Sequence, residues 1–199
     1  MFVKGRKAEQ YEQTRRQLLD IARRLFAERG FAGAGTEEVA RRAGVTRGAL
    51  YYHFRDKRNL FLAVVEDLQQ QILDRVQRVA SAEADPWEGL RVGLHAYLDA
   101  CMDPAVQRIV LTDAPSVLGR STWRELDARY GFGLLRAALQ GLIDAGLMAP
   151  QPVDPLAHML LGALSEAGMV IAESEDMVAT RREVGDALDR LLHGLRIGR

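Results

Sequence analysis

Residues 36–57 read TEEVARRAGVTRGALYYHFRDK, and this stretch decides the fold. Ala40, Gly44 and Leu50 stand at the offsets that a helix-turn-helix requires. The alanine is small enough for two helices to cross, the glycine suits the tight turn between them, and the leucine closes the pair from the second helix. The stretch therefore predicts two short helices packed at a fixed angle.

The second of these helices, expected over residues 46–54, has two different faces. Leu50 and Phe54 lie one turn apart and point toward the core. The opposite face carries Arg47, Gly48, Tyr51 and Tyr52. Since two tyrosines on a solvent face are unusual without a partner, this face predicts a contact with another molecule.

Each residue of that face can contact DNA. Arg47, at the start of the helix, can reach guanine O6 and N7 in the major groove and is the predicted base-reading residue. Gly48 either lets backbone approach the base edges closely or is a helix-packing glycine. Tyr51 and Tyr52 can contact a thymine methyl or sugar with the ring and phosphate with the hydroxyl, or they are core aromatics. Tyr52 is expected to be the more buried of the two.

Four flanking residues extend the predicted DNA-binding set. Thr36 and Thr46 are expected to cap the two helices and can also donate to phosphate. His53 is either a phosphate donor or a structural histidine beside the core. Lys57 is the expected phosphate contact at the edge of the motif, and a solvated lysine is the alternative.

Charge is distributed unevenly along the chain. Residues 1–58 contain 14 Lys and Arg against 7 Asp and Glu, whereas the rest contains 13 against 20, so a formal net charge of zero hides a basic N-terminal part. Such a part suits phosphate binding, and the acidic remainder would be repelled by the same duplex. Lys4, Arg6 and Lys7 predict a flexible basic arm over residues 1–10 that reaches an adjacent groove, unless they are simply solvated.

Hydrophobic periodicity predicts an all-α chain. A helix-turn-helix domain is expected over residues 1–58 and a second helical domain over residues 59–199. Upstream of the motif, a helix is expected over residues 14–29, begun by a capping box at Thr14 and ended by Gly30. The helices expected downstream are residues 57–80, 86–102, 104–113, 121–145, 154–173 and 177–195. The long helix 57–80 would join the two domains.

Composition and motifs argue against a membrane protein and against an enzyme. Although 48% of the residues are apolar, no stretch approaches the roughly 18 uncharged apolar residues of a membrane span, so a cytoplasmic location is expected. The single cysteine, Cys101, excludes an intrachain disulfide. The sequence lacks a nucleophile elbow, a phosphate loop and paired catalytic carboxylates. His95 and Asp99, one helical turn apart, are too few to hold a metal, so no metal or cofactor is expected.

Residues 36–57, preceded by Ile21–Ala22, Phe26 and Gly30–Phe31, closely resemble the DNA-binding domain of TetR/AcrR-family regulators over roughly residues 14–62. This resemblance implies nine helices, homodimerisation through the last two, a ligand cavity in the C-terminal domain and, usually, repression that a ligand relieves. The family's DNA-contact positions fall here on Thr36, Thr46, Arg47, Gly48, Tyr51, His53 and Lys57.

The C-terminal half is predicted to dimerise through residues 154–173 and 177–195. The first helix combines small residues, from Gly162 to Gly168, with leucines, and the second adds a leucine stripe. Two such helix pairs can form a four-helix interface between subunits, and an internal core is the alternative.

A ligand pocket is expected between the helices of residues 86–145 and 154–173. Its candidate lining residues are Tyr97, Cys101, Met102, Leu111, Trp123, Tyr130 and His158. Arg108 and Asp113 are expected to form a structural pair. The sequence thus predicts a repressor that binds a near-palindromic operator and is released by a small, largely apolar effector of unknown identity. An activator and an effector-independent architectural DNA-binding protein are the alternatives.

Overall fold

The computed structural model describes residues 2–197, with side chains from Lys7 onward except that of residue 127. It is all-helical, as predicted. The elements are α1 (Phe2–Gly33), α2 (Thr36–Arg42), α3 (Arg47–His53), α4 (Lys57–Ala80), α5 (Pro86–Ala100), the π-helical η1 (Val106–Asp113), α6 (Ala114–Val117), α7 (Arg120–Asp127), the π-helical η2 (Ala128–Phe132), α8 (Gly133–Asp144), α9 (Val153–Glu173) and α10 (Met177–Leu195). Over this part of the chain, η1–α6 and α7–η2–α8 each form one continuous run, which leaves nine helices.

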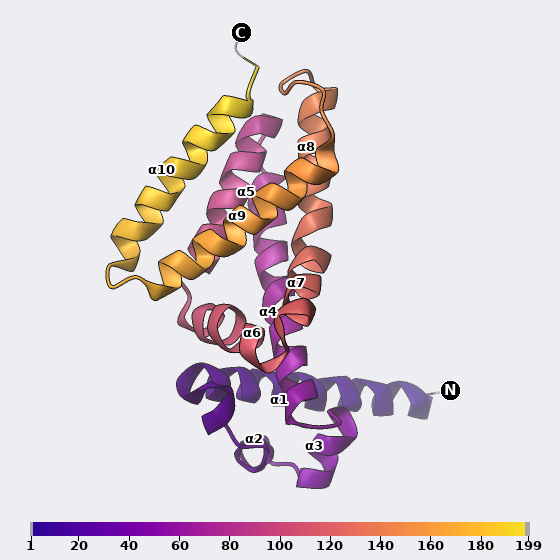
Figure 1. The fold of residues 1–199 in the computed structure, drawn as a ribbon. Coiled ribbons are helices and arrows are strands. Elements are labelled where there is room, and N and C mark those ends of the chain that lie inside the picture. The colour runs from indigo at the N-terminus through magenta and orange to yellow at the C-terminus, as the bar shows by residue number, and fades with distance from the viewer. Residues whose placement is uncertain (1, 198–199) are drawn as a thin grey trace.

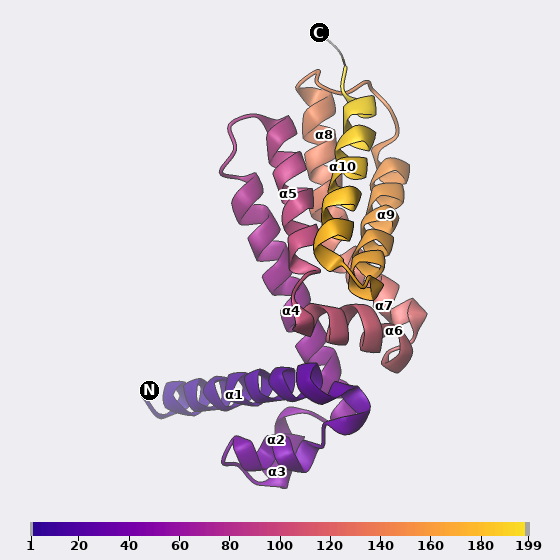
Figure 2. The same cartoon turned by 90° about the vertical axis from the view of Figure 1, so that its left-hand side faces the viewer.

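The molecule is elongated, with α1, α2 and α3 at one end and a helical bundle at the other (Figure 1). The long helix α4 begins in the first part and continues into the second, where it packs along α5. Figure 2 shows α9 and α10 side by side as an antiparallel pair on one flank of the bundle. This arrangement gives the helix-turn-helix a free outer face while α4 connects it to the bundle.

Local capping explains why several predicted helix limits are confirmed. The Asp56 side chain accepts a hydrogen bond from the backbone N–H of Asn59 and begins α4. Asp176 does the same for the N–H of Ala179 at the start of α10. A side-chain oxygen in this position satisfies one of the free amides of a first helical turn. Both helices therefore run over the predicted residues, 57–80 and 177–195.

The predicted start of the first helix is wrong. Helix α1 begins at Phe2, and the Thr14 hydroxyl donates to the carbonyl of Gln10 inside the helix instead of capping it. Residues 2–10 are therefore helical and do not form a flexible arm; the side chains of Lys4 and Arg6 lie outside the described ones. Lys, Glu and Gln are good helix formers, so this polar segment extends the helix. Because it has no apolar stripe, hydrophobic periodicity did not predict it.

Two predicted helices in the C-terminal half are also corrected. The helix expected over residues 104–113 does not end before Pro115, because η1 passes directly into α6 and the proline lies in the first turn of α6. The proline ring fixes φ at about −65°, which suits a helix, and the missing N–H removes one hydrogen bond. Conversely, the helix expected over residues 121–145 contains the π-helical segment η2 between α7 and α8.

The apolar core runs from one part of the molecule into the other. Phe26 and Phe61 are fully buried at its centre, with ring centroids 5.1 Å apart, and the core continues to Ile109 and Leu111 of η1. A second cluster fills the bundle around Leu139. Because η1 shares a core with α1 and α4, the helix-turn-helix is packed against the bundle as well as being connected to it.

Candidate DNA-binding interface and ligand cavity

The helix-turn-helix is formed by α2 and α3. Gly44, in the turn, has φ of +66°, a left-handed conformation that favours glycine. Ala40 and Leu50 are 3% and 0% exposed, and the N–H of Val45 donates to the carbonyl of Ala40 across the turn, 3.0 Å away. All three residues that defined the motif therefore have the positions that were predicted for them.

The two threonines differ in their roles. Thr46 caps α3 as expected, since its hydroxyl accepts from the N–H of Ala49 at 3.1 Å. Thr36 does not cap α2, because Gly35 occupies the capping position and Thr36 is the first residue of the helix. The Thr36 hydroxyl instead lies 3.2 Å from the hydroxyl of Tyr51 and links the start of α2 to α3.

The outer face of α3 presents Arg47, Gly48 and Tyr52 to solvent. The expectation that Tyr52 would be the more buried tyrosine is wrong: Tyr52 is 78% exposed, whereas Tyr51 is half-buried. The ring of Tyr51 lies under the Arg47 guanidinium, 5.5 Å from its centroid. The hydrogen bond to Thr36, and then Arg47, lower the pKa of Tyr51.

Arg47 is held in place by a weak surface interaction. Its guanidinium lies 2.9 Å from the carboxylate of Glu37, and the two side chains are 63% and 76% exposed. Ion pairs this exposed contribute about 0–1 kcal/mol. Arg47 can therefore exchange Glu37 for the edge of a guanine at little cost.

Gly48 has no packing role in this chain. A Cβ atom added there would meet only the Thr46 hydroxyl, at 3.9 Å, which is ordinary contact. The helix-packing interpretation is therefore wrong, and the empty space on this side of α3 is open to a partner.

Replacing Gly48 by alanine is expected to raise stability and lower operator affinity. Alanine is the better helix former by up to about 1 kcal/mol, whereas a methyl group would hold the helix away from the base edges. Thermal unfolding and fluorescence anisotropy measure the two effects. Gly133→Ala is the control, since Gly133 is also helical and open to solvent, and it should leave DNA binding unchanged. Unchanged operator affinity in Gly48→Ala would exclude the close approach.

His53 and Lys57 are both partly buried by α1. The His53 ring packs on Tyr11, with centroids 4.3 Å apart, and its Nδ1 is buried without a hydrogen-bond partner in the described chain. This burial, and secondarily Arg15, lower the pKa of His53, which supports the structural interpretation of this residue. The Lys57 ammonium lies 4.5 Å from the Phe31 ring centroid, and burial lowers its pKa as well.

A polar contact joins the bundle to the end of α1. The Asp113 carboxylate accepts a hydrogen bond from the N–H of Phe31 at 2.7 Å, and Arg108 lies 3.6 Å from the same carboxylate, so the predicted pair is confirmed. The Arg108 guanidinium occupies the space that a Cβ of Gly30 would need. Arg58 of α4 donates to two carbonyls at the C-terminal end of α6. Segment η1–α6 therefore contacts both α1 and the first turn of α4.

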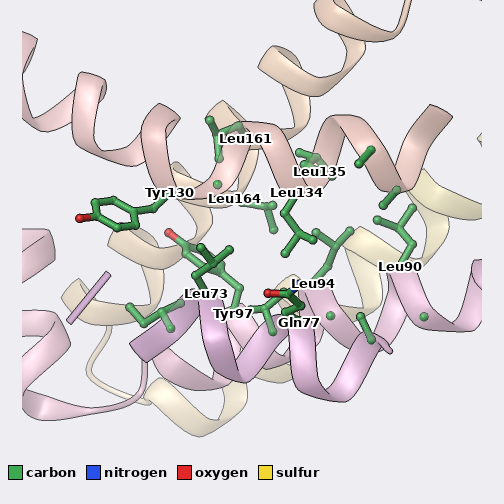
Figure 3. A pocket seen from close by; sticks show the side chains of 18 of the residues that line it. Leu73, Gln77, Leu90, Leu94, Tyr97, Tyr130, Leu134, Leu135, Leu161 and Leu164 are labelled. Carbon is green, nitrogen blue, oxygen red and sulfur yellow. The ribbon is translucent and has the colours of Figure 1, made fainter. Parts of the chain in front are cut away.

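The bundle contains a cavity of about 420 Å³ between α4, α5, α8 and α9 (Figure 3). Leucines form much of its wall, from Leu73 of α4 to Leu161 and Leu164 of α9. Its polar lining residues are Gln69, Gln77, Ser81, Tyr97 and Tyr130. Among the side chains that the structure describes, none that lines this cavity carries a charge.

The predicted ligand-binding residues are distributed over three places. Tyr97 and Tyr130 line the large cavity. Cys101, Leu111 and Trp123 line, together with Tyr97, a second cavity of about 10 Å³.

Two predicted residues line neither cavity. Met102 packs against the core of the bundle, and His158 is exposed, its ring stacked 4.3 Å from that of Phe132. The prediction missed α4, which contributes Gln69 to both cavities. A glutamine in the otherwise apolar stripe of this helix was the available signal.

His95 and Asp99 are engaged by α10. His95 Nε2 lies 2.8 Å from a carboxylate oxygen of Asp189, and Asp99 accepts from Arg181. The part of the chain that the structure describes has no group of three His, Cys, Asp or Glu that could hold a metal.

Helices α9 and α10 carry an unpartnered apolar surface. Met159 and Val170 of α9 are 73% and 45% exposed, and Val178 and Leu191 of α10 are 73% and 60% exposed. Helix α9 has the length and composition of a membrane span, and 33% of its most apolar window is buried in this chain. Its inner face packs into the bundle through residues such as Leu164, so the outer face remains to be covered.

Comparison with known proteins assigns both parts of the chain to one group. Residues 18–64 match the family model for bacterial regulatory proteins of the tetR family, and residues 87–195 match the tetracyclin repressor-like C-terminal domain. A crystal structure of a TetR-family transcriptional regulator from Pectobacterium atrosepticum is 38% identical, with a TM-score of 0.86, over 96% of this chain and 97% of that one. The TetC protein of transposon Tn10 from Escherichia coli is 26% identical over 81% of this chain and 82% of its own length.

Two more distant structures hold small molecules. RolR, in complex with resorcinol, is 23% identical with a TM-score of 0.71 over 92% of this chain and 89% of that one. FadR from Bacillus subtilis, in complex with stearoyl-CoA, is 19% identical with a TM-score of 0.70 over 86% and 96%. At these identities the likeness concerns the fold.

Proposed function

The chain belongs to the TetR family of bacterial regulatory proteins, and we propose that it is a cytoplasmic, homodimeric repressor released from a near-palindromic operator by a small, largely apolar molecule. Proteins of this family are transcription regulators and not enzymes, bind operator DNA and dimerise through the C-terminal domain. The observation that supports this proposal most directly is the outer face of α3, where Arg47 and Tyr52 are exposed and Gly48 has no packing role. The proposed domains are residues 1–58 and 59–199.

The proposed DNA contacts combine base recognition and phosphate binding. Arg47 reads a guanine, and Gly48 permits the approach. The phosphate and sugar contacts come from the ends and edges of α2 and α3. They are proposed for Thr36, Thr46, Tyr51, Tyr52, His53 and Lys57. The exposure of Tyr52 supports its inclusion, whereas His53 would contact phosphate only as a neutral donor.

The proposed subunit interface is the outer face of α9 and α10. Helix α9 is apolar, but only one-third of its most apolar window is buried in its own chain. An exposed apolar surface of this size supports a contact with another apolar surface. In a symmetric dimer the same patch from each subunit meets its copy, so two helix pairs form a four-helix interface. The two recognition helices then lie at a fixed separation, which suits half-sites about one turn of DNA apart, or more.

Release by a ligand would act through the walls of the cavities. Helix α4 lines both, and η1 lines the smaller one. The same two elements are joined to the N-terminal part of the molecule: Arg58 connects the first turn of α4 to the end of α6, and the Asp113–Phe31 hydrogen bond connects η1 to α1. A ligand that shifts them would change the separation of the recognition helices, with a coupling of about 1–3 kcal/mol in typical allosteric proteins.

Replacing Asp113 by alanine is expected to weaken this coupling. The Phe31 N–H loses its acceptor, so a shift of η1 no longer moves α1. The ratio of the operator affinity without ligand to that with ligand should therefore fall from about 5- to 150-fold toward one. Anisotropy titrations with a cavity-binding compound measure the ratio. Asp103→Ala is the matched control, because Asp103 accepts from amides at the other end of η1, away from α1. Equal ratios in the two variants would contradict the role of Asp113.

The proposed function is tested on the DNA that flanks the gene. The protein should bind one duplex containing a near-palindrome much more tightly than its scrambled version, and removing the gene should raise expression of the neighbouring target. A compound that stabilises the protein in a thermal-shift screen should also release that duplex. Binding without release by any stabilising compound would favour an effector-independent DNA-binding protein. Lower expression after removal would indicate an activator.

A further inference from the structure

The large cavity has one open and one closed end. Gln77 and Ser81, toward the C-terminal end of α4, are exposed, whereas Gln69, two turns earlier, is only 5% exposed. The side chains between them are almost all apolar (Figure 3). A ligand in this space would therefore meet a hydrogen-bonding group at its inner end and water at its outer end.

Gln69 interrupts the apolar stripe of α4, in which Leu68 and Ile72 are buried neighbours, and it is itself buried. Its side chain lines both cavities and makes no hydrogen bond with any described residue. Burying an unpaired amide is unfavourable, because its hydrogen bonds to water are lost without replacement. Packing alone would favour leucine here, so the glutamine indicates a polar partner inside the cavity.

A second unpaired group lies at the same end. The small cavity shares Gln69, Ile72 and Tyr97 with the large one and is also lined by Trp123. Trp123 is 8% exposed, and its Nε1 is buried without a hydrogen-bond partner in the described chain. The indole N–H only donates, and the amide of Gln69 both donates and accepts. At about 10 Å³, the space suits a single hydroxyl or carbonyl oxygen.

We propose that the cavity selects uncharged molecules with an apolar body and one oxygen-bearing end, and that this end binds to Gln69 and Trp123. The apolar body lies along α4, α5 and α8 toward the open end. A carboxylate, phosphate or ammonium group at the inner end would be buried without an opposite charge, since the described lining residues are all uncharged, and is therefore rejected. This inference concerns the effector site of the proposed function and rests on it.

Three matched probes test the selection: para-hexylphenol, hexylbenzene and para-hexylbenzoate. They share one apolar body, and at neutral pH they carry a neutral hydroxyl, no polar group and a negative charge, respectively. Their dissociation constants are measured by titration calorimetry on the full chain without DNA. The phenol should bind about tenfold more tightly than hexylbenzene, because one net hydrogen bond increases affinity by about that factor. The benzoate should bind at least about a hundredfold more weakly than the phenol.

Gln69→Leu and Gln77→Leu separate the two ends of the cavity. Gln69→Leu should reduce the preference for the phenol over hexylbenzene well below tenfold, because only the Trp123 N–H is left to bind the hydroxyl, whereas Gln77→Leu should retain the tenfold preference. Replacing an unpaired buried amide by leucine does not threaten the fold, and circular dichroism confirms this. Equal preferences in the two variants, tight binding of the benzoate or no binding of the phenol would each overturn the inference. Operator binding and release are measured separately, so failure here leaves the proposed regulation testable by itself.

Discussion

Replacing Arg47 by alanine is expected to abolish discrimination between the operator and scrambled DNA. Arg47 is exposed at the first position of α3, where it forms a surface ion pair with Glu37 and lies over the Tyr51 ring. A bidentate contact from arginine to guanine contributes about 1–3 kcal/mol of discrimination, which is about 5- to 150-fold for each half-site. A dimer loses this contact twice. Anisotropy titrations with both duplexes give the specificity ratio directly.

Lys57→Ala is the comparison that separates base recognition from charge. It should weaken binding to both duplexes alike and flatten the dependence of affinity on salt, because one fewer counterion is released for each subunit. Lys57 also donates to the carbonyl of Ala32, so unfolding of each variant has to be measured alongside. Equal losses of specificity in Arg47→Ala and Lys57→Ala would contradict this division of roles.

Replacing Leu191 by glutamate is expected to dissociate the dimer. The leucine is 60% exposed in the single chain, so its replacement costs the folded subunit little. In the proposed interface, however, two carboxylates would be buried close to the two-fold axis without a partner charge. In a dimer, binding of one subunit to its half-site raises the effective concentration of the other subunit at the second half-site. Separate subunits lose this effect, so operator affinity should fall by about 10²- to 10⁴-fold.

Sedimentation equilibrium and operator titrations together measure this effect. Gln151→Glu is the control, since it adds the same charge at an exposed position of the loop before α9. That variant should remain dimeric and bind the operator normally. A Leu191→Glu variant that stays dimeric with undiminished affinity would place the subunit interface elsewhere.

The helix-turn-helix could be predicted because its determinants are local. Gly44 supplies the turn, Thr46 caps α3 and Asp56 begins α4, all within a short stretch of sequence. The relative burial of the two tyrosines could not be predicted, because it depends on contacts with other elements. Tyr51 meets Thr36 of α2, and Tyr52 remains exposed beside Tyr11 of α1.

The cavity was harder to predict because four helices far apart in the sequence form it. Apolar and aromatic character selected Met102 and His158, which pack elsewhere, as well as Tyr97 and Tyr130, which line the cavity. Burial decides between these outcomes, and burial depends on the packing of the whole bundle. Gln69 was missed because α4 was interpreted only as a connection between domains.

Selection of duplexes from a random pool by the purified dimer tests whether α3 recognises an operator through Arg47. We expect one enriched near-palindrome with half-sites about one helical turn apart, or more, each containing a guanine whose preference disappears in Arg47→Ala. Enrichment of no sequence, or of a motif unaffected by Arg47→Ala, would contradict operator recognition by this helix.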